Sequence, residues 1–427
     1  MRRKPTHRAC APFVIVLAIT LNWAQIRAQQ GAAKVSTSTN AQQTASGLSF
    51  EDVFTLAARD NLQIRAARLR SIVAGTNILI AGQRPNPEFI TSYTRSEPRM
   101  NYSISQPIEM GGKRARRLDV ARGEARLAEL DVENALRTLR RDTRVAYFNL
   151  ALARDTLGLG RQGVEQAQRL ADIAQARFEA GDIAQFEVLQ ARLAVSRAEN
   201  DLARLENVER IARAGLNLLL NRTPETSLDL RETLFVPRSP VNTAQLTERA
   251  LTLNVELRAA EEQIRTEQSR LRLARAGRVP DLLLEPGIES IDPALPNNYG
   301  FKMQVTVPLP IFNRSRGEIA RSNALIEQLT AEREAARQRI TSEIGQASLR
   351  LETARQQVNF YETRLLPEAV RVSEMALEAY RAGQTGILPV VDAQRNFTEV
   401  RQGYLQALFD YQSALADLEQ AAGVTLR

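Results

Sequence analysis

The feature that most constrains the fold of this 427-residue chain is that its sequence repeats itself. The stretch RFEAGDIAQFEVLQAR (177–192) has a counterpart in AYRAGQTGILPVVDAQ (379–394), and the two align Gly181 with Gly383 at a spacing of 202 residues. A unit that occurs twice predicts two similar structural halves. We place repeat 1 at 48–221, a linker rich in Pro and Thr at 222–241, and repeat 2 at 242–424.

Apolar residues on both sides of these glycines recur three and four positions apart. Val188, Ala191 and Val195 begin such a series, and the residues 202 positions later keep the same spacing. This spacing is typical of a coiled-coil seam. Each repeat should therefore contain a long helix, a turn and a returning helix, at about 112–221 and about 314–424. In full, we expect each repeat to run helix, strand, strand, long helix, returning helix. The first long helix would measure about 100 Å, and Pro367 should bend its counterpart.

Four shorter segments predict strands. In 299–309 the apolar residues Tyr299, Phe301 and Met303 begin an alternation with polar residues that lasts eleven positions. Such segments are close to the nine to eleven residues with which a tilted strand crosses a bilayer. An amphipathic strand pair over a soluble core would alternate in the same way, and the signal is weak in any one segment. The predicted strands are 88–95, 100–108, 281–291 and 299–309.

The first residues predict export from the cytoplasm. A basic start, an apolar run at Phe13–Leu21 and a cleavage sequence ending at Ala28 are typical of a signal peptide at 1–28. The small polar residues of 29–47 then form a flexible leader. Removing the signal lowers the formal charge from +8 to about +3, so nucleic acid is not an expected partner.

The predicted mature chain has no residues for most catalytic or metal chemistry. The single histidine, His7, and the single cysteine, Cys10, both lie in the signal. Without imidazole or thiol, soft-metal coordination and Ser-His or Cys-His catalysis are excluded, and we expect neither a cofactor nor an enzyme. Scattered Asp and Glu residues leave only a carboxylate hydrolase open, with no cluster to support it. GLGRQG (158–163) follows no strand, so it does not predict a dinucleotide site.

Basic residues gather where strands give way to helices. Cations at a helix N-terminus oppose the helix dipole, so another partner should favour them. Anionic lipid headgroups at a membrane boundary would do so, although an ordinary solvated charge run remains an alternative. Because an open sheet edge is not tolerated in lipid, four strands would have to join those of other copies. The residues concerned are Lys113, Arg114, Arg116, Arg117, Arg314 and Arg316.

The segments QPIEMGGKRARR (106–117) and VPLPIFNRSRG (307–317) resemble the TolC-like outer-membrane efflux proteins, in particular the cobalt–zinc–cadmium resistance branch. The resemblance covers about 48–424. It implies a mostly α protein with a β membrane part: a homotrimer with a twelve-stranded β-barrel in the outer membrane, continued by a twelve-helix α-barrel in the periplasm. It also implies a passive exit duct that docks on a periplasmic adaptor and a proton-driven inner-membrane pump, with metal cations among the candidate substrates.

The resemblance also assigns roles to residues near the two turns. Phe178, Gly181, Tyr380 and Gly383 correspond to the periplasmic tips on which adaptors dock. Asp392, and less closely Glu187, correspond to an acidic ring that narrows the entrance. The simpler interpretation is that the glycines permit a tight reversal and that the carboxylates lie on a solvated face.

Two other functions remain open from the sequence. The same architecture serves as the outer-membrane duct of protein-secretion systems. A periplasmic structural coiled coil or adaptor is a further alternative, but adaptors usually carry one helical hairpin, whereas this chain carries two.

Overall fold

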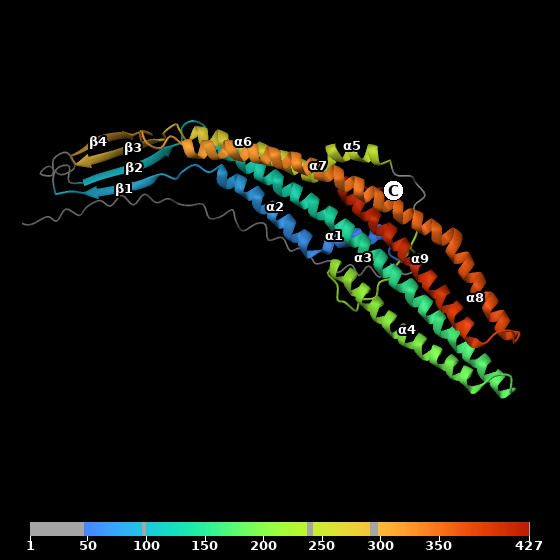
Figure 1. Cartoon of the computed structure of the whole chain (residues 1–427). Helices are drawn as coiled ribbons and strands as arrows, with labels where there is room; N and C mark the ends of the chain where they lie inside the picture. Colours follow the sequence, from blue (N-terminus) through green and yellow to red (C-terminus); the bar gives the residue numbers. More distant parts are fainter. Residues whose placement is uncertain (1–46, 96–99, 237–241, 291–297, 427) are drawn as a thin grey trace, which may run out of the picture. The chain divides into compact units, whose positions relative to one another are not determined.

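The computed structural model describes residues 47–95, 100–236, 242–290 and 298–426, and these residues are mostly helical (Figure 1). The predicted signal peptide at 1–28 lies outside them. So does the predicted leader at 29–47 apart from Gly47, and so do the last five residues of the predicted linker. From Gly47 onward the chain forms one compact unit.

Each repeat contains the same series of elements. Two short helices, where the sequence predicted one, lead into two strands, which are followed by a long helix and a returning helix. Repeat 1 consists of α1 (Phe50–Asp60), α2 (Leu62–Ala81), β1 (Glu88–Tyr93), β2 (Met100–Ile108), α3 (Lys113–Glu179) and α4 (Gln185–Leu219). Repeat 2 consists of α5 (Thr243–Leu253), α6 (Val255–Ala276), β3 (Leu282–Ser290), β4 (Tyr299–Thr306), α7 (Arg316–Phe360), a π-helical turn (Tyr361–Leu365), α8 (Leu366–Arg381) and α9 (Ile387–Ala422).

Asparagine fixes the corner between the two short helices in both repeats. Asn61 accepts hydrogen bonds from the first amides of α2 through its side-chain oxygen, and its Nδ2 donates to the carbonyl of Leu219 at 3.0 Å. Asn254 caps α6 in the same way and donates to the carbonyl of Ala421 at 3.1 Å. One side chain therefore caps the second helix of each pair and ties it to the end of the returning helix, which satisfies groups that helix termini leave free.

The long helix is continuous in repeat 1 and interrupted in repeat 2. α3 runs for 67 residues, which is about 100 Å. Its counterpart passes through the π-helical turn immediately before Pro367. Proline has no N–H, and its ring collides with the carbonyl four residues earlier. The backbone therefore widens into a π-helical turn instead of keeping the regular α-helical hydrogen bonds.

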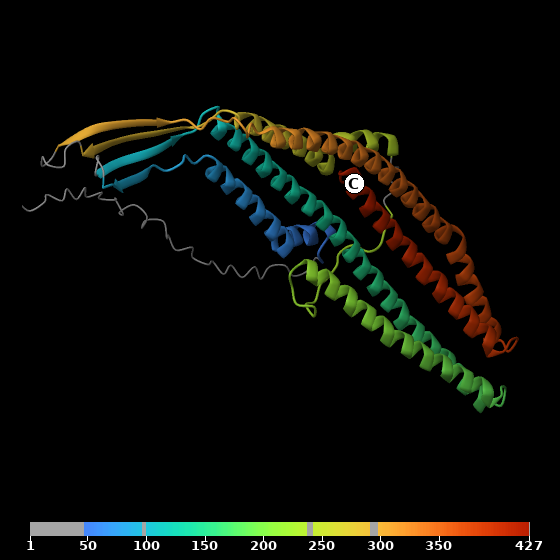
Figure 2. The same cartoon turned by 60° about the vertical axis from the view of Figure 1, so that its left-hand side comes forward.

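The four strands form one antiparallel sheet in the order β1-β2-β3-β4. The register aligns Phe89 with Ile104 and Ile288 with Phe301, which puts these apolar side chains on one face of the sheet. Ser103 pairs with Gly287 on the other face. The sheet lies at one end of the helices, and the α3–α4 and α8–α9 turns lie at the other end (Figures 1 and 2).

The main hydrophobic core lies midway along the helices, where residues from both repeats meet. Tyr147 on α3 is fully buried there; its hydroxyl donates to the carbonyl of Leu48 at 2.9 Å and accepts from the amide of Glu232 at 3.0 Å. These bonds hold the parallel bridge between Leu48 and Leu230. Burial raises the pKa of Tyr147 to about 12, so the phenol stays protonated.

In the part of the chain that the structure describes, no helix combines the length and the hydropathy needed to cross a membrane.

Candidate functional site

The two turns farthest from the sheet have the same backbone geometry. Gly181 has φ +80° and Gly383 has φ +75°, so both occupy the left-handed region that favours glycine. The amide of Asp182 donates to the carbonyl five residues earlier, and the amide of Gln384 does the same in the second turn, both at 2.9 Å. This is the glycine-terminated end by which helices satisfy their last carbonyls. A Cβ on Gly181 would meet no atom within 4 Å, so backbone conformation alone selects glycine there.

A second, smaller hydrophobic cluster holds the two turns together. Tyr380, near the end of α8, is fully buried and packs with residues of α3, α4 and α9. Its ring therefore faces inward between the two helical hairpins and is not presented to a partner in this conformation. The cluster, which we call the tip cluster, consists of Leu170, Ala174, Ala191, Tyr380, Ile387 and Val390.

Arg177 links the end of α3 to the end of α8. Its Nη1 donates to the carbonyl of Tyr380 at 2.9 Å, and its guanidinium carbon lies 4.9 Å from the centre of the Tyr380 ring. A cation at this position also complements the negative end of the α8 dipole. The sequence did not single out Arg177, because the aligned residue of the other repeat is Ala379 and the repeat pattern carries no signal for it.

Of the two predicted entrance carboxylates, only Glu187 contacts this site. Its side chain is half-buried, and its Oε2 has no hydrogen-bond partner among the described residues. Burial, and then the nearby charge of Glu187, raises the pKa of Tyr380 above its usual value. Asp392 lies on the first turns of α9 and is exposed, so the two carboxylates differ in their surroundings.

The exposed surface of the tips is apolar on the α4 side. Phe178, at the end of α3, is partly exposed, and Phe186 and Leu189 on α4 are more exposed still. Of the predicted docking residues, Phe178 therefore lies at the surface, whereas Tyr380 does not. Phe186 and Leu189 were not identified from the sequence, although both lie in the first turns of α4, just after Gly181.

Most of the basic residues at the first strand-to-helix junction have partners within the chain. Lys113 lies 2.8 Å from the carboxylate of Asp281, and Arg117 pairs with Glu109. Arg114 donates from its Nε to the carbonyl of Gly82 at 2.6 Å, and Arg116 lies 3.3 Å from Asp119. Three of the four cations at the first junction therefore have a carboxylate partner within the chain, and their contact with lipid stays a prediction.

No metal or nucleotide site emerges elsewhere in the described residues. They contain no group of three or more His, Cys, Asp or Glu side chains that could hold a metal ion. The GLGRQG segment lies inside α3, where Gly158 and Gly163 face open space.

Solved structures share this arrangement of two helical hairpins on a four-stranded sheet. The Campylobacter jejuni CmeC outer membrane channel matches with a TM-score of 0.74 at 17% identity, over 88% of this chain and 85% of that one. CusC, a transmembrane channel, matches with a TM-score of 0.73 at 18% identity, over 90% and 96% of the two chains. The fold is thus that of the TolC-like outer-membrane channels.

The model of the outer membrane efflux protein family matches residues 53–222 and 246–424, one segment in each repeat. The chain belongs to this family. It is accordingly an outer-membrane efflux channel that extends into the periplasm, a passive duct and not an enzyme. TolC-like channels are homotrimers that work with adaptor proteins and inner-membrane pumps.

Two relatives are named as metal-resistance proteins. The cobalt-zinc-cadmium resistance protein CzcC of Cupriavidus metallidurans is 26% identical over 386 residues, which is 90% of this chain and 91% of the relative. The nickel-cobalt-cadmium resistance protein NccC of Alcaligenes xylosoxydans xylosoxydans is 24% identical over 316 residues, 68% of each chain.

Proposed function

We propose that three copies of this chain close a twelve-stranded β-barrel in the outer membrane and form the exit duct of a metal-cation efflux pump. The helices of the three copies would continue the barrel as a twelve-helix tunnel in the periplasm. The turns at Gly181 and Gly383 would form its lower opening, where a periplasmic adaptor docks.

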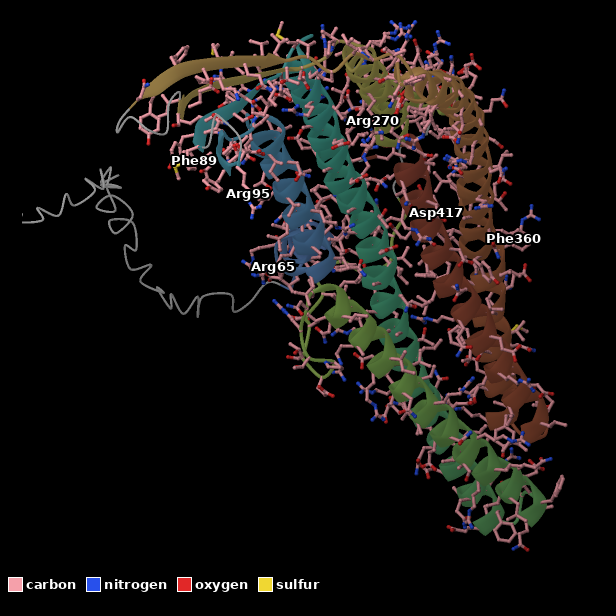
Figure 3. All side chains as sticks on the ribbon, turned by 90° about the vertical axis from the view of Figure 1, so that its left-hand side faces the viewer. Arg65, Phe89, Arg95, Arg270, Phe360 and Asp417 are labelled. Carbon is pink, nitrogen blue, oxygen red and sulfur yellow. The ribbon has the colours of Figure 1, made fainter. Side chains whose placement is uncertain are left out.

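The observation that carries this proposal is the inverted burial of the sheet. Phe301 is 75% exposed and Phe89, labelled in Figure 3, is 70% exposed, whereas Ser103 and Ser105 on the opposite face are buried. A sheet that covers a soluble core would bury its apolar face instead. Apolar residues outward and polar residues inward is the pattern of a strand in a membrane barrel.

The free edges of the sheet support a shared barrel. Among the described residues β1 pairs only with β2, and β4 pairs only with β3. Unpaired amides and carbonyls along these edges could not be satisfied by lipid. Pairing of β4 of one copy with β1 of the next removes every edge, and three copies supply twelve strands, enough for a lumen.

Metal cations are the substrate that the available observations favour. The resistance named for CzcC and NccC concerns divalent metals, and Asp392 is an exposed carboxylate beside the predicted entrance. Three copies of a carboxylate around an axis would attract cations. We also propose that the pump partner is driven by protons, which predicts that an uncoupler abolishes export.

The assembly is tested by the native mass of the protein extracted in detergent from purified outer membranes. We expect a trimer. A monomer that is released from the cells without detergent would refute the barrel.

The substrate is tested by growth on cobalt, zinc and cadmium salts in cells that lack the chain. We expect the wild-type chain to restore resistance, and Asp392→Asn to restore it less well at equal abundance. Glu399→Gln is the matched control, because Glu399 lies on the same helix and is paired with Arg395 at 2.9 Å. Unchanged resistance with and without the chain would exclude these metals as substrates while leaving the trimer intact.

A further inference from the structure

The two strand-to-helix junctions differ, although the repeats that contain them are alike. The first junction is compact: Gly111 and Gly112 both have positive φ and turn the chain directly into α3. Its cations are neutralised within the chain, as described above for Lys113 and Arg117. Arg114, by contrast, has only the carbonyl of Gly82 as a partner.

The second junction, residues 307–316, is open and is called here the junction segment. Phe312 is 99% exposed, Leu309 73% and Ile311 61%. Arg314 donates from its Nε to the carbonyl of Pro310 at 3.3 Å. Among the described residues neither Arg314 nor Arg316 has a carboxylate within ion-pair distance, in contrast to the first junction. The junction segment thus combines exposed apolar side chains with two uncompensated cations.

The apolar side of β4 continues into the junction segment. The alternation that starts at Tyr299 extends beyond the last strand residue, Thr306, through Val307, Leu309 and Ile311. The residues between them are Pro308 and Pro310, which have no amide hydrogen to leave unpaired. The amide of Ile311 donates to the carbonyl of Leu309 at 2.8 Å. The backbone of this extended stretch therefore exposes few free donors, which is the condition for contact with an apolar phase.

We propose that the junction segment lies in the periplasmic leaflet of the outer membrane, as an interfacial anchor that only repeat 2 provides. Leu309, Ile311 and Phe312 would contact the upper acyl chains. Arg314 and Arg316 would bind the phosphodiester groups of phospholipids, whose charge complements theirs. This inference rests on the proposed barrel, because it takes the apolar face of β4 to be the lipid-facing one.

Charge favours phospholipid over a second copy of the chain as the occupant. In a closed barrel β4 would lie beside β1 of the neighbouring copy, and the connection that leads into β1 is residues 82–87. That connection carries Arg84, and the first residue of β1 is Glu88. Because these two charges cancel, the neighbouring copy brings no net negative charge to Arg314 and Arg316, whereas a phosphodiester would neutralise them.

Tryptophan fluorescence can test this placement directly. The only tryptophan of the chain, Trp23, lies in the predicted signal peptide at 1–28, so in the processed protein any introduced tryptophan is the sole reporter. Phe312→Trp would be purified as the trimer and reconstituted into vesicles of phosphatidylcholine and phosphatidylglycerol. We expect blue-shifted emission that is largely quenched when the vesicles contain lipids brominated near the headgroup end of their acyl chains.

Two further reporters separate this inference from the proposed function. Phe301→Trp on β4 should be quenched if the sheet crosses the membrane, and Phe186→Trp at the tip should not be quenched in either case. If Phe301→Trp is quenched but Phe312→Trp is not, the junction segment faces water or a second copy. The anchor is then wrong and the barrel stands. If neither is quenched, both proposals fail.

The role of the two cations has its own readout. The double substitution Arg314→Glu and Arg316→Glu should lower the quenching of the tryptophan in Phe312→Trp when the vesicles are rich in phosphatidylglycerol. The matched control is Arg65→Glu on α2, far from the sheet, which should leave the quenching unchanged (Figure 3). Equal quenching in all three proteins would show that the arginines do not bind phosphodiesters and would overturn that part of the proposal.

Discussion

Arg177→Ala should loosen the second turn of the entrance without unfolding the protein. Arg177 is the residue that joins the end of α3 to the end of α8 at the tip cluster. Its removal leaves the apolar contacts of Tyr380 in place. The carbonyl of Tyr380 also keeps a hydrogen bond from the amide of Gly383 at 3.1 Å, so no buried acceptor is left unpaired.

The expected loss is the direct contribution of the arginine. A hydrogen bond from a charged donor contributes about 1.5–3 kcal/mol, and a partly exposed cation–π contact about 0.5–1 kcal/mol. Because Arg177 is only half-buried, solvent screens part of this, and we take about 2–3 kcal/mol for the link between the hairpins. That free energy corresponds to a roughly 30- to 150-fold increase in local opening.

Hydrogen exchange of the α8–α9 turn measures this opening, because exchange of protected amides follows the population of the locally open state. The amides of residues 384–391 should exchange faster in Arg177→Ala by that factor, while those of the main core around Tyr147 keep their protection. Arg381→Ala is the control, since Arg381 is exposed in the last turn of α8. Equal exchange in the two variants would refute the link through Arg177.

Two further predictions follow from packing and from ionisation. A Cβ on Gly123 would lie 2.3 Å from Thr266 Oγ1, so Gly123→Ala should destabilise the α3–α6 contact by about 1–3 kcal/mol. Gly158 has open space around it, so Gly158→Ala should stabilise α3 by about 0.5–1 kcal/mol. Thermal unfolding followed by circular dichroism should shift the melting temperature in opposite directions for the two variants, and shifts of the same sign would contradict the packing. Burial and the hydrogen bond donated to Glu362 raise the pKa of Tyr404 from 10.0 to about 12. Because the pKa of Tyr404 in the folded protein exceeds the usual tyrosine value, the stabilisation of the folded state is complete below pH 10 and is lost as the pH rises toward 12. Tyr404→Phe should therefore remove one late step from the tyrosinate absorbance titration. Loss of a step near pH 10 instead would show that Tyr404 ionises normally.

The repeat and its periodicities carry most of what could be predicted about the fold. Two patterns carried the prediction: the alternation in 299–309 and the three- and four-residue spacing after Gly181. Both show which face of a strand or helix is apolar, and this depends only on residues that are close together in the sequence. The class of the protein was indicated by the resemblance of the segments 106–117 and 307–317 to a known family. The π-helical turn was not predicted, because Pro367 indicates that the regular α-helix is interrupted but not which backbone conformation replaces it.

The site was less predictable than the fold. Phe178, Glu187 and Asp392 were singled out by the family resemblance, but their exposure differs, and Tyr380 is buried. Arg177 escaped notice because its partner is a carbonyl 203 residues away, which no local pattern encodes.

The sequence by itself determined the two-fold repetition, the strand pair and helical hairpin of each repeat, the positions of the turns, and the absence of histidine and cysteine from the predicted mature chain. Only the tertiary structure decided which cations are already paired, which aromatic ring holds the two hairpins together, and which junction stays open. The physical reason is that composition and periodicity act along the chain, whereas ion pairs and burial depend on groups brought together from distant segments, such as Lys113 with Asp281.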